Sequence, residues 1–196
     1  MNGSSNFAIH DLSYSYSDTP VFEHINEVFE AGQINVLMSP SGSGKSTLLS
    51  LIAGILPLQS GRIEYPVYSP RFSMVFQDNR LLESQSIFSN LKLINPALTP
   101  EAVAGALKSV RLPYQSDKKV CKLSGGEKRR IAILRALMAP YDILLLDEPF
   151  TGLDEENKLI MMEYVKKQTI GHTAILVTHN KDEAEFFNCK ISRCLA

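Results

Sequence analysis

The sequence predicts an α/β fold with a mostly parallel sheet core, an N-terminal antiparallel β part and a helical segment between the two. Three observations lead to this prediction. Alternating apolar residues fill the first third of the chain, strand signals disappear over residues 78–138, and apolar strands alternate with helices from residue 143 onward. Strands that alternate with helices indicate a parallel sheet covered on both faces. A length of 196 residues fits one domain.

The N-terminal third is predicted to form antiparallel strands, a central strand and one helix. Apolar residues alternate at the spacing of half-buried strands before residue 30. After a loop of small residues, apolar positions from Leu48 to Leu56 repeat at helical spacing, and Pro57 with Gly61 closes that segment. The expected strands are 7–9, 12–16, 21–29, 34–38, 62–65 and 72–76.

The rest of the chain is predicted to begin with helices and to end in alternating strands and helices. Thr99 is a capping residue before Pro100, and Glu101 places an acid in the first turn, which is typical of a helix start. The later expected elements are strands at 143–146, 173–178 and 190–195, and helices at 155–167 and 181–187.

Composition and charge exclude several classes of protein. Twenty Lys and Arg residues against 21 Asp and Glu residues leave a net charge of −1, so no nucleic-acid partner is expected. No apolar run approaches the ~20 residues of a membrane span, and no secretory signal is recognisable. Cys121, Cys189 and Cys194 lack paired zinc spacing and are expected to be free thiols in a reducing compartment.

A phosphate-binding loop is predicted between the strand at 34–38 and the helix that follows. Small residues allow successive backbone N–H groups to converge on phosphate oxygens, and the helix start at Lys45 adds its positive dipole end. Lys45 is expected to reach the β- and γ-phosphates and Ser46 to ligate magnesium. The structural alternative is a small-residue loop that caps a helix. The loop consists of Ser39, Pro40, Ser41, Gly42, Ser43, Gly44, Lys45, Ser46 and Thr47.

Ser39 departs from the phosphate-loop pattern, which has a glycine at this first position. A serine makes the same turn if its φ is negative. We therefore expect the loop to keep its function with this change.

Two carboxylates follow a strongly apolar strand. Asp147 and Glu148 come directly after the run Ile143–Leu146, and open α/β sheets bind ligands at the carboxyl ends of their strands. Asp147 is expected to hold magnesium through water, and Glu148 to accept a proton from an attacking water. The alternative is a strand that ends at a polar turn, since Pro149 follows.

A second helix start is predicted to bind an anion. Ser124 and Glu127 have the spacing of a capping box, which is a common structural feature. A capping box does not require Gly125 and Gly126, which leave backbone N–H groups open at the positive helix end.

Together these residues resemble an ATP-binding cassette (ABC) ATPase, and the resemblance covers nearly the whole chain. The run 39–46 resembles the Walker A loop, Asp147 to Pro149 resembles Walker B with its catalytic glutamate, and the run 124–127 resembles the family signature. The resemblance implies a P-loop NTPase fold of the ABC type, ATPase activity, and ATP and Mg²⁺ as ligands. It also implies one domain over residues 1–196, with a helical subdomain at roughly 78–138.

Four further residues match the family motifs one by one. Gln77 resembles the Q-loop glutamine, with a catalytic role and a place among the magnesium ligands. Asp154 resembles the D-loop aspartate, His179 the catalytic switch histidine, and Tyr16 the aromatic residue that stacks on adenine. Each has a structural alternative: a surface strand end for Gln77, an N-cap for Asp154, a helix cap for His179 and an edge-strand contact for Tyr16.

The resemblance implies the ATP-hydrolysing subunit of a membrane transporter. In this family the signature of one subunit contacts the γ-phosphate bound by the other, so that ATP joins two cassettes, as a homodimer or pseudo-symmetric sandwich, and hydrolysis releases them. Integral-membrane permease subunits are expected on separate chains, with this protein cytoplasmic and peripheral on the inner face of the cell membrane. The alternatives are a soluble, non-transport ABC ATPase and an ordinary P-loop kinase or GTPase, which needs neither the signature nor His179.

The region after Gln77 indicates how the chain meets a permease. Residues 76–82 are similar to the Q-loop region of importers for nitrate, sulfonates and taurine, although Glu83 and Ser84 stand near the place of a usual Pro-Trp pair. The sequence stops 17 residues after His179, so no C-terminal regulatory domain is expected. Four apolar residues of the helical segment are candidates for contact with a permease: Phe88, Leu91, Leu93 and Ile94.

Overall fold

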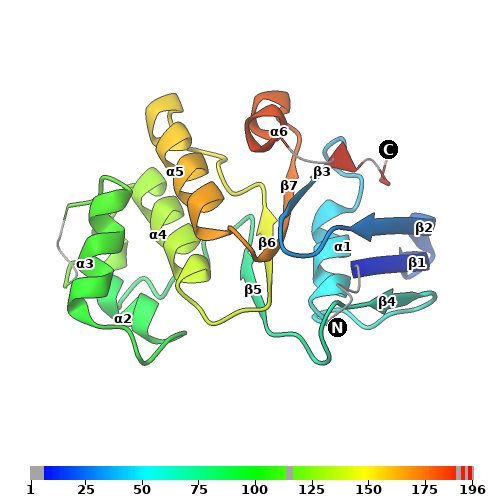
Figure 1. The fold of residues 1–196 in the computed structure, drawn as a ribbon, viewed down its shortest axis with the longest axis horizontal. Coiled ribbons are helices and arrows are strands. Elements are labelled where there is room, and N and C mark those ends of the chain that lie inside the picture. Colours follow the sequence, from blue (N-terminus) through cyan, green and yellow to red (C-terminus); the bar gives the residue numbers. More distant parts are fainter. Residues whose placement is uncertain (1–6, 114–116, 189–190, 193, 196) are drawn as a thin grey trace.

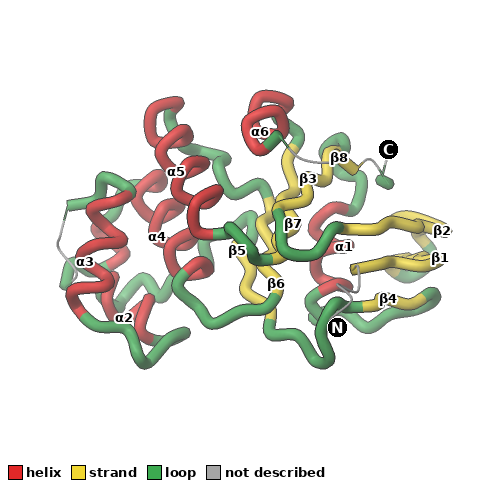
Figure 2. The backbone as a smooth tube through the Cα atoms, viewed as in Figure 1, coloured by secondary structure: helices red, strands yellow, loops and turns green. Residues whose placement is uncertain are grey.

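Two β-sheets organise the chain in the computed structural model, which describes residues 7–113, 117–188, 191–192 and 194–195 (Figures 1 and 2). The first sheet is antiparallel, with strand order β2-β1-β4. Its strands are β1 (Phe7–Tyr16), β2 (Thr19–Phe29) and β4 (Arg62–Glu64). The second sheet has five parallel strands in the order β5-β6-β7-β3-β8. Its strands are β5 (Phe72–Val75), β6 (Ile143–Asp147), β7 (Thr173–Thr178), β3 (Ile34–Met38) and β8 (Ile191–Ser192).

Helices cover the parallel sheet and extend one end of the molecule. Figure 1 shows α2 and α3 at the end opposite the antiparallel sheet, with α1 beside the antiparallel strands. The helices are α1 (Lys45–Ile52), α2 (Ile87–Lys92), α3 (Pro100–Ser109), α4 (Gly125–Leu137), α5 (Glu155–Gln168) and α6 (Lys181–Phe187), with a 3₁₀ turn η1 (Val120–Lys122). The predicted fold class is confirmed: a parallel core, an N-terminal antiparallel part and a helical segment.

The parallel sheet separates two hydrophobic cores. Successive side chains of a strand point to opposite faces, so Ile143 and Leu145 of β6 join α1 and the antiparallel sheet in one core. Leu144 and Leu146 join α4, α5 and α6 in the other. All five residues of β6 are buried, which explains its unbroken apolar run.

The register of the parallel strands brings their carboxyl ends to one edge. Asp147 pairs with Val177, and Met38 pairs with Thr178. The segments that leave β3, β6 and β7 therefore start side by side, although more than 100 residues separate the first from the second. This edge is where open α/β sheets bind ligands.

Three predictions of where elements begin or end were wrong. The strands expected at 7–9 and 12–16 form one strand, β1 (Phe7–Tyr16). The helix expected to extend to Leu56 ends at Ile52, because Gly54 adopts a left-handed φ of 68° that stops the helix. Ile55, expected on the buried face, is 54% exposed as a result. The last strand is shorter than expected, and β8 comprises Ile191–Ser192, with residues 189–190 and 193 outside the described part.

The segment 78–138 holds α2, α3, η1 and α4. In its described part, only the isolated bridge between Ser86 and Lys119 has strand-type pairing. Thr99 caps α3 by accepting a hydrogen bond from the Ala102 N–H, as the sequence predicted. The end of α4 packs on the sheet, where Ser73 of β5 donates a hydrogen bond to the Ala136 carbonyl at 2.8 Å. The limits of a helical subdomain stay a prediction.

The cysteines agree with the expectation of free thiols where the structure describes them. Cys121 is exposed and free, and Cys194 is free and partly buried. Burial raises the pKa of the Cys194 thiol to about 11, so this sulfur stays protonated at neutral pH. Cys189 lies outside the described residues.

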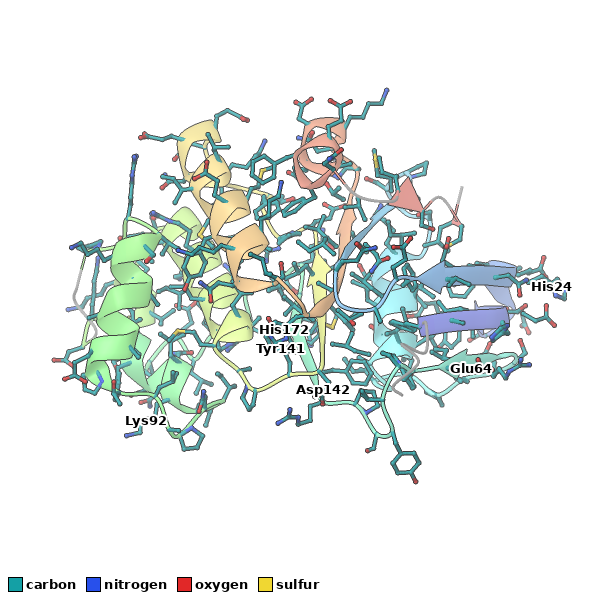
Figure 3. All side chains as sticks on the ribbon, viewed as in Figure 1. His24, Glu64, Lys92, Tyr141, Asp142 and His172 are labelled. Carbon is teal, nitrogen blue, oxygen red and sulfur yellow. The ribbon has the colours of Figure 1, made fainter. Side chains whose placement is uncertain are left out.

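An ion pair lies at the amino-terminal ends of β5 and β6 in the parallel sheet. The Arg71 guanidinium donates two hydrogen bonds of 3.0 Å to the carboxylate of Asp142, which is labelled in Figure 3. The same carboxylate also accepts a hydrogen bond from the Arg71 N–H at 2.8 Å. These bonds lower the pKa of Asp142 to about 2. The pair therefore contributes stability above the ordinary aspartate pKa and loses it as the pH falls toward 2.

We expect Asp142→Asn to lower the free energy of unfolding slightly at pH 7, because the ion pair is largely exposed to solvent. The difference from wild type should shrink as the pH falls from about 4 toward 2, where the wild-type carboxyl also loses its charge. Urea denaturation at several pH values measures this difference in the free energy of unfolding. A difference that is independent of pH would contradict this account.

Candidate functional site

A pocket of about 410 Å³ lies where the carboxyl ends of the parallel strands meet. Its lining combines the loop after β3, the two carboxylates at the end of β6 and the glutamine after β5. Ten of its eleven lining residues are predicted site residues, and Val21 was missed. The lining residues are Tyr16, Val21, Ser41, Gly42, Gly44, Lys45, Ser46, Thr47, Gln77, Asp147 and Glu148.

The phosphate loop needs glycine at Gly44 for two reasons. Gly44 has a left-handed φ of 88°, which glycine adopts at little cost. A Cβ at this position would also lie 2.5 Å from Val21 Cγ1. Gly44 precedes α1 without a side-chain cap, and the first turn holds no acidic residue. The positive end of α1 therefore points an uncapped set of N–H groups at the pocket.

Lys45 lies folded over the loop. Its side chain is 6% exposed, and Nζ donates hydrogen bonds to the carbonyls of Ser39 at 3.0 Å and Pro40 at 2.7 Å. The Glu148 carboxylate is 3.8 Å away. Phosphate oxygens in the pocket can replace these carbonyls as acceptors for the ammonium group.

Ser39 has a negative φ, as its place in the loop requires. Its buried hydroxyl lies 2.5 Å from the Ser43 hydroxyl. Ser39, Pro40 and Ser43 belong to the loop but do not line the pocket.

Oxygen atoms suited to magnesium lie together beside the loop. The Ser46 hydroxyl donates to Asp147 Oδ2 at 2.5 Å, and Gln77 lines the same pocket. Burial raises the pKa of Asp147, which is 3% exposed, and the Ser46 hydrogen bond opposes this shift. In the described part of the chain no three His, Cys, Asp or Glu side chains cluster as a metal site. Oxygen donors with one carboxylate fit Mg²⁺, which is usually completed by waters and nucleotide phosphates.

Glu148 is held at the pocket by its backbone and by His179. Its φ of 44° is left-handed, and its N–H donates to the Val177 carbonyl at 2.9 Å. His179 Nδ1 lies 3.1 Å from Glu148 Oε1. Because a carboxylate oxygen only accepts, Nδ1 is the donor. The alternative role for His179 is not observed, since Asn180 caps α6 instead.

Asp154 does not line the pocket. It is the N-cap of α5 and accepts hydrogen bonds from the Asn157 N–H at 2.9 Å and from Asn157 Nδ2 at 2.7 Å. These bonds lower the pKa of Asp154. Asp154 therefore has the N-cap role that the sequence analysis gave as its structural alternative.

Tyr16 lies at the mouth of the pocket and is 51% exposed. Its hydroxyl is 3.4 Å from the Thr47 hydroxyl. Its ring packs edge-on against Tyr14, with 5.1 Å between the centroids. The exposed part of the ring is available to a flat ligand.

The signature start lies outside the pocket. Ser124 caps α4, and Glu127 completes a capping box by accepting the Ser124 N–H at 2.7 Å. This bond lowers the pKa of Glu127. Ser124 and Gly125 are exposed, while Gly126 packs near the Gly152 carbonyl and Leu153.

A buried charged residue beside the site, which the sequence analysis did not single out, lies on the same helix. Arg129 is 4% exposed and donates to the carbonyls of Asp147 and Glu148. The sequence shows only that Arg129 is a charged residue within a predicted helix. No sequence pattern indicates that a buried arginine will donate to backbone carbonyls of distant segments.

Comparison with known proteins identifies the family of the chain. The family model "ABC transporter" matches residues 22–151. The chain is 36% identical to the thiamine import ATP-binding protein ThiQ of Brucella abortus biovar 1 (strain 9-941) over 200 residues, which covers 94% of this chain and 82% of that protein. It is 37% identical to the taurine import ATP-binding protein TauB of Escherichia coli O157:H7 over 193 residues, which covers 91% of this chain and 75% of that protein.

A solved structure has the same fold. A putative ABC transporter ATP-binding protein from Pyrococcus furiosus superposes with a TM-score of 0.79 at 26% identity, covering 90% of this chain and 92% of that one. The family match covers well over half of the chain. The chain therefore belongs to the ABC transporter family and is an ATP-binding, ATP-hydrolysing transporter subunit.

Proposed function

We propose that two copies of this chain hold two Mg-ATP molecules between them and drive a separate membrane permease. One observation carries the proposal: two helix starts of the chain, at Lys45 and at Ser124, are of a kind that can bind an anion, and of these two only the one at Lys45 lines the pocket. The described lining of the pocket includes no residue of the signature run 124–127. A partner copy can bring its own signature to this pocket, so that each nucleotide is held from both sides.

In this arrangement Ser124, Gly125 and Gly126 act on the nucleotide of the other copy. Their backbone N–H groups lie at the positive end of a 13-residue helix, α4, and such ends favour phosphate. Glu127 holds the cap through the Ser124 N–H, so it orients the signature and does not itself bind phosphate. Asp154 keeps the neighbouring D-loop in place by capping α5.

The pocket residues divide the work of hydrolysis. Lys45 binds the phosphates, and Ser46, Asp147 and Gln77 hold Mg²⁺. The metal, when bound, offsets the charge of the transferred phosphoryl group. Glu148 takes the proton of the attacking water, and His179 keeps the Glu148 carboxylate in position through the 3.1 Å hydrogen bond. Tyr16 stacks on the adenine.

The proposed transport direction is import of a small solute. The two relatives compared above are named for thiamine import and taurine import. These solutes differ in chemistry while the identities are nearly equal, so the ATPase sequence does not specify the solute. None of the described helices is both long and apolar enough to cross a membrane. We place the protein on the cytoplasmic face, held there by its permease.

The surface beside α2 is the proposed permease contact. Leu93 is 64% exposed and Leu82 is 45% exposed. Leu91, a sequence candidate for this contact, belongs to the core with no exposed surface, which corrects that expectation. Phe88 is partly buried and lies 5.4 Å below the Lys92 ammonium, labelled in Figure 3.

We expect Leu93→Glu, alone or with Leu82→Glu, to abolish ATP-driven uptake in vesicles that contain the permease. Basal ATPase activity of the isolated subunit should stay within about twofold, because neither residue touches the pocket. Ile170→Glu is a matched control, since Ile170 is 77% exposed and lines a surface pocket with residues of β3 and α6 rather than of α2. Equal loss of uptake and ATPase would indicate misfolding, and full uptake by the double variant would contradict the docking surface.

A further inference from the structure

Arg129 is a buried cation that pairs with backbone rather than with a carboxylate. It is 4% exposed, and among the described residues no carboxylate lies within salt-bridge distance of it. Burial lowers the pKa of its guanidinium. Burying a charge is costly unless its hydrogen bonds are satisfied, so the acceptors that surround Arg129 explain why it is tolerated.

The acceptors belong to two segments that end neighbouring strands. Nε donates to the Pro149 carbonyl at 2.7 Å, and Nη2 donates to the carbonyls of Asp147 at 3.0 Å and Glu148 at 2.7 Å. Nη1 faces the other segment, with the Phe76 carbonyl at 2.6 Å and the Gln77 carbonyl at 3.1 Å. All three guanidinium nitrogens therefore donate hydrogen bonds, and together they reach five backbone carbonyls.

These two segments carry the groups that act on the nucleotide. Asp147 and Glu148 end β6, and Gln77 follows β5. Arg129 itself lies on α4, one turn after the signature residues at its start. One planar side chain thus connects the signature helix to the general base and to the glutamine of the same copy.

The backbone of Glu148 needs such support. Its φ of 44° is left-handed, a conformation that a residue with a side chain keeps only when its surroundings impose it. The Arg129 Nη2 bond to the Glu148 carbonyl and the Glu148 N–H bond to Val177 hold this residue from both sides.

We propose that Arg129 is a positioning residue that fixes the end of β6 and the Gln77 segment to the signature helix. When the signature closes on the nucleotide of the other copy, α4 moves these two segments with it, and Glu148 and Gln77 reach their working positions. This inference rests on the proposed two-copy arrangement. A lysine cannot do the same, because one ammonium lacks the fork that spans both segments.

Arg130 provides a matched control on the same helix. It is also buried, at 8% exposed, and it donates to the Val110 carbonyl at 2.9 Å and to Asn157 Oδ1 at 2.8 Å. Its other acceptors are the carbonyls of Gly126 and Arg111, both at 3.4 Å, so none of its hydrogen bonds in the described part of the chain reaches residues 76–79 or 147–149. A second link from α4 exists at Arg135, which donates to the carbonyls of Asn79 and Arg80, so the Gln77 segment keeps one tether when Arg129 is changed.

The test compares Arg129→Lys with Arg130→Lys in the full chain. Both should lower the melting temperature by similar amounts, because each removes buried hydrogen bonds. Only Arg129→Lys should lower kcat, by tenfold or more. The KM for ATP and the binding of a labelled ATP analogue should change by less than about threefold, since Lys45 and Ser46 are untouched.

Two results would overturn the proposal: an unchanged kcat in Arg129→Lys, or a loss of kcat in Arg130→Lys that matches it. If Arg129→Lys does not fold, Arg129→Gln is compared with Arg130→Gln in the same way. ATP-dependent dimer formation is measured separately with the Glu148→Gln protein. A missing dimer there contradicts the two-copy arrangement, whereas the comparison of the two arginines is still decided by kcat.

Discussion

Glu148→Gln should lower the rate of ATP hydrolysis by about 10²–10⁴-fold, the usual contribution of a positioned general base. The amide keeps the size of the side chain but cannot take the proton of the attacking water. ATP binding should survive because Lys45, Ser46 and Asp147 are unchanged. Single-turnover hydrolysis and equilibrium binding of labelled ATP measure the two effects separately. Glu163→Gln, an exposed position on α5, is the control and should hydrolyse ATP at the wild-type rate.

The same Glu148→Gln variant should accumulate as a dimer with ATP and run as a monomer with ADP on a sizing column. Blocked hydrolysis leaves the closed state populated, since ATP stabilises that state and is not consumed. Adding Ser124→Arg should abolish the dimer by placing bulk at the shared phosphate. Hydrolysis at the native rate by Glu148→Gln would disprove the catalytic role. Tight ATP binding without dimer formation would disprove the two-copy arrangement.

Lys45→Ala should weaken ATP binding by roughly 10- to 150-fold, because a hydrogen bond to a charged group contributes about 1.5–3 kcal/mol. Without ligand, a small drop in melting temperature is expected, since the Ser39 and Pro40 carbonyls lose their donor. Titration with a fluorescent ATP analogue measures the affinity. Lys167→Ala, an exposed position near the end of α5, serves as the control. Unchanged affinity in Lys45→Ala would contradict the assignment of the phosphate loop.

Local patterns predicted most of the elements and the phosphate loop. The short run Ile143–Leu146 predicted a strand covered on both faces, and β6 is buried throughout. Thr99 with Pro100 specified the start of α3 through capping, which involves neighbours in sequence. The glycines of the loop and Lys45 follow from backbone requirements of the same kind. Each of these signals involves residues within a few positions of one another.

Helix ends and exposure were less predictable. The apolar spacing from Leu48 to Leu56 fits a longer helix, but Gly54 in a left-handed conformation ends it at Ile52. Leu91 and Leu93 are equally apolar in sequence, and packing buries the first while exposing the second. Periodicity describes one face of a helix and does not determine which helices lie against it.

The sequence by itself determined the fold class, the family and all but one of the residues that line the pocket. Only the tertiary structure decided that His179 touches Glu148 and that Arg129 binds the carbonyls of two strand ends. Both contacts depend on the register of β5, β6 and β7 and on the packing of α4 against them. The partners in these contacts are 31 and 53 positions apart in the sequence. No periodic pattern of residues indicates such a contact, because the packing of separate elements determines the distance between the two side chains and the conformation of either segment does not.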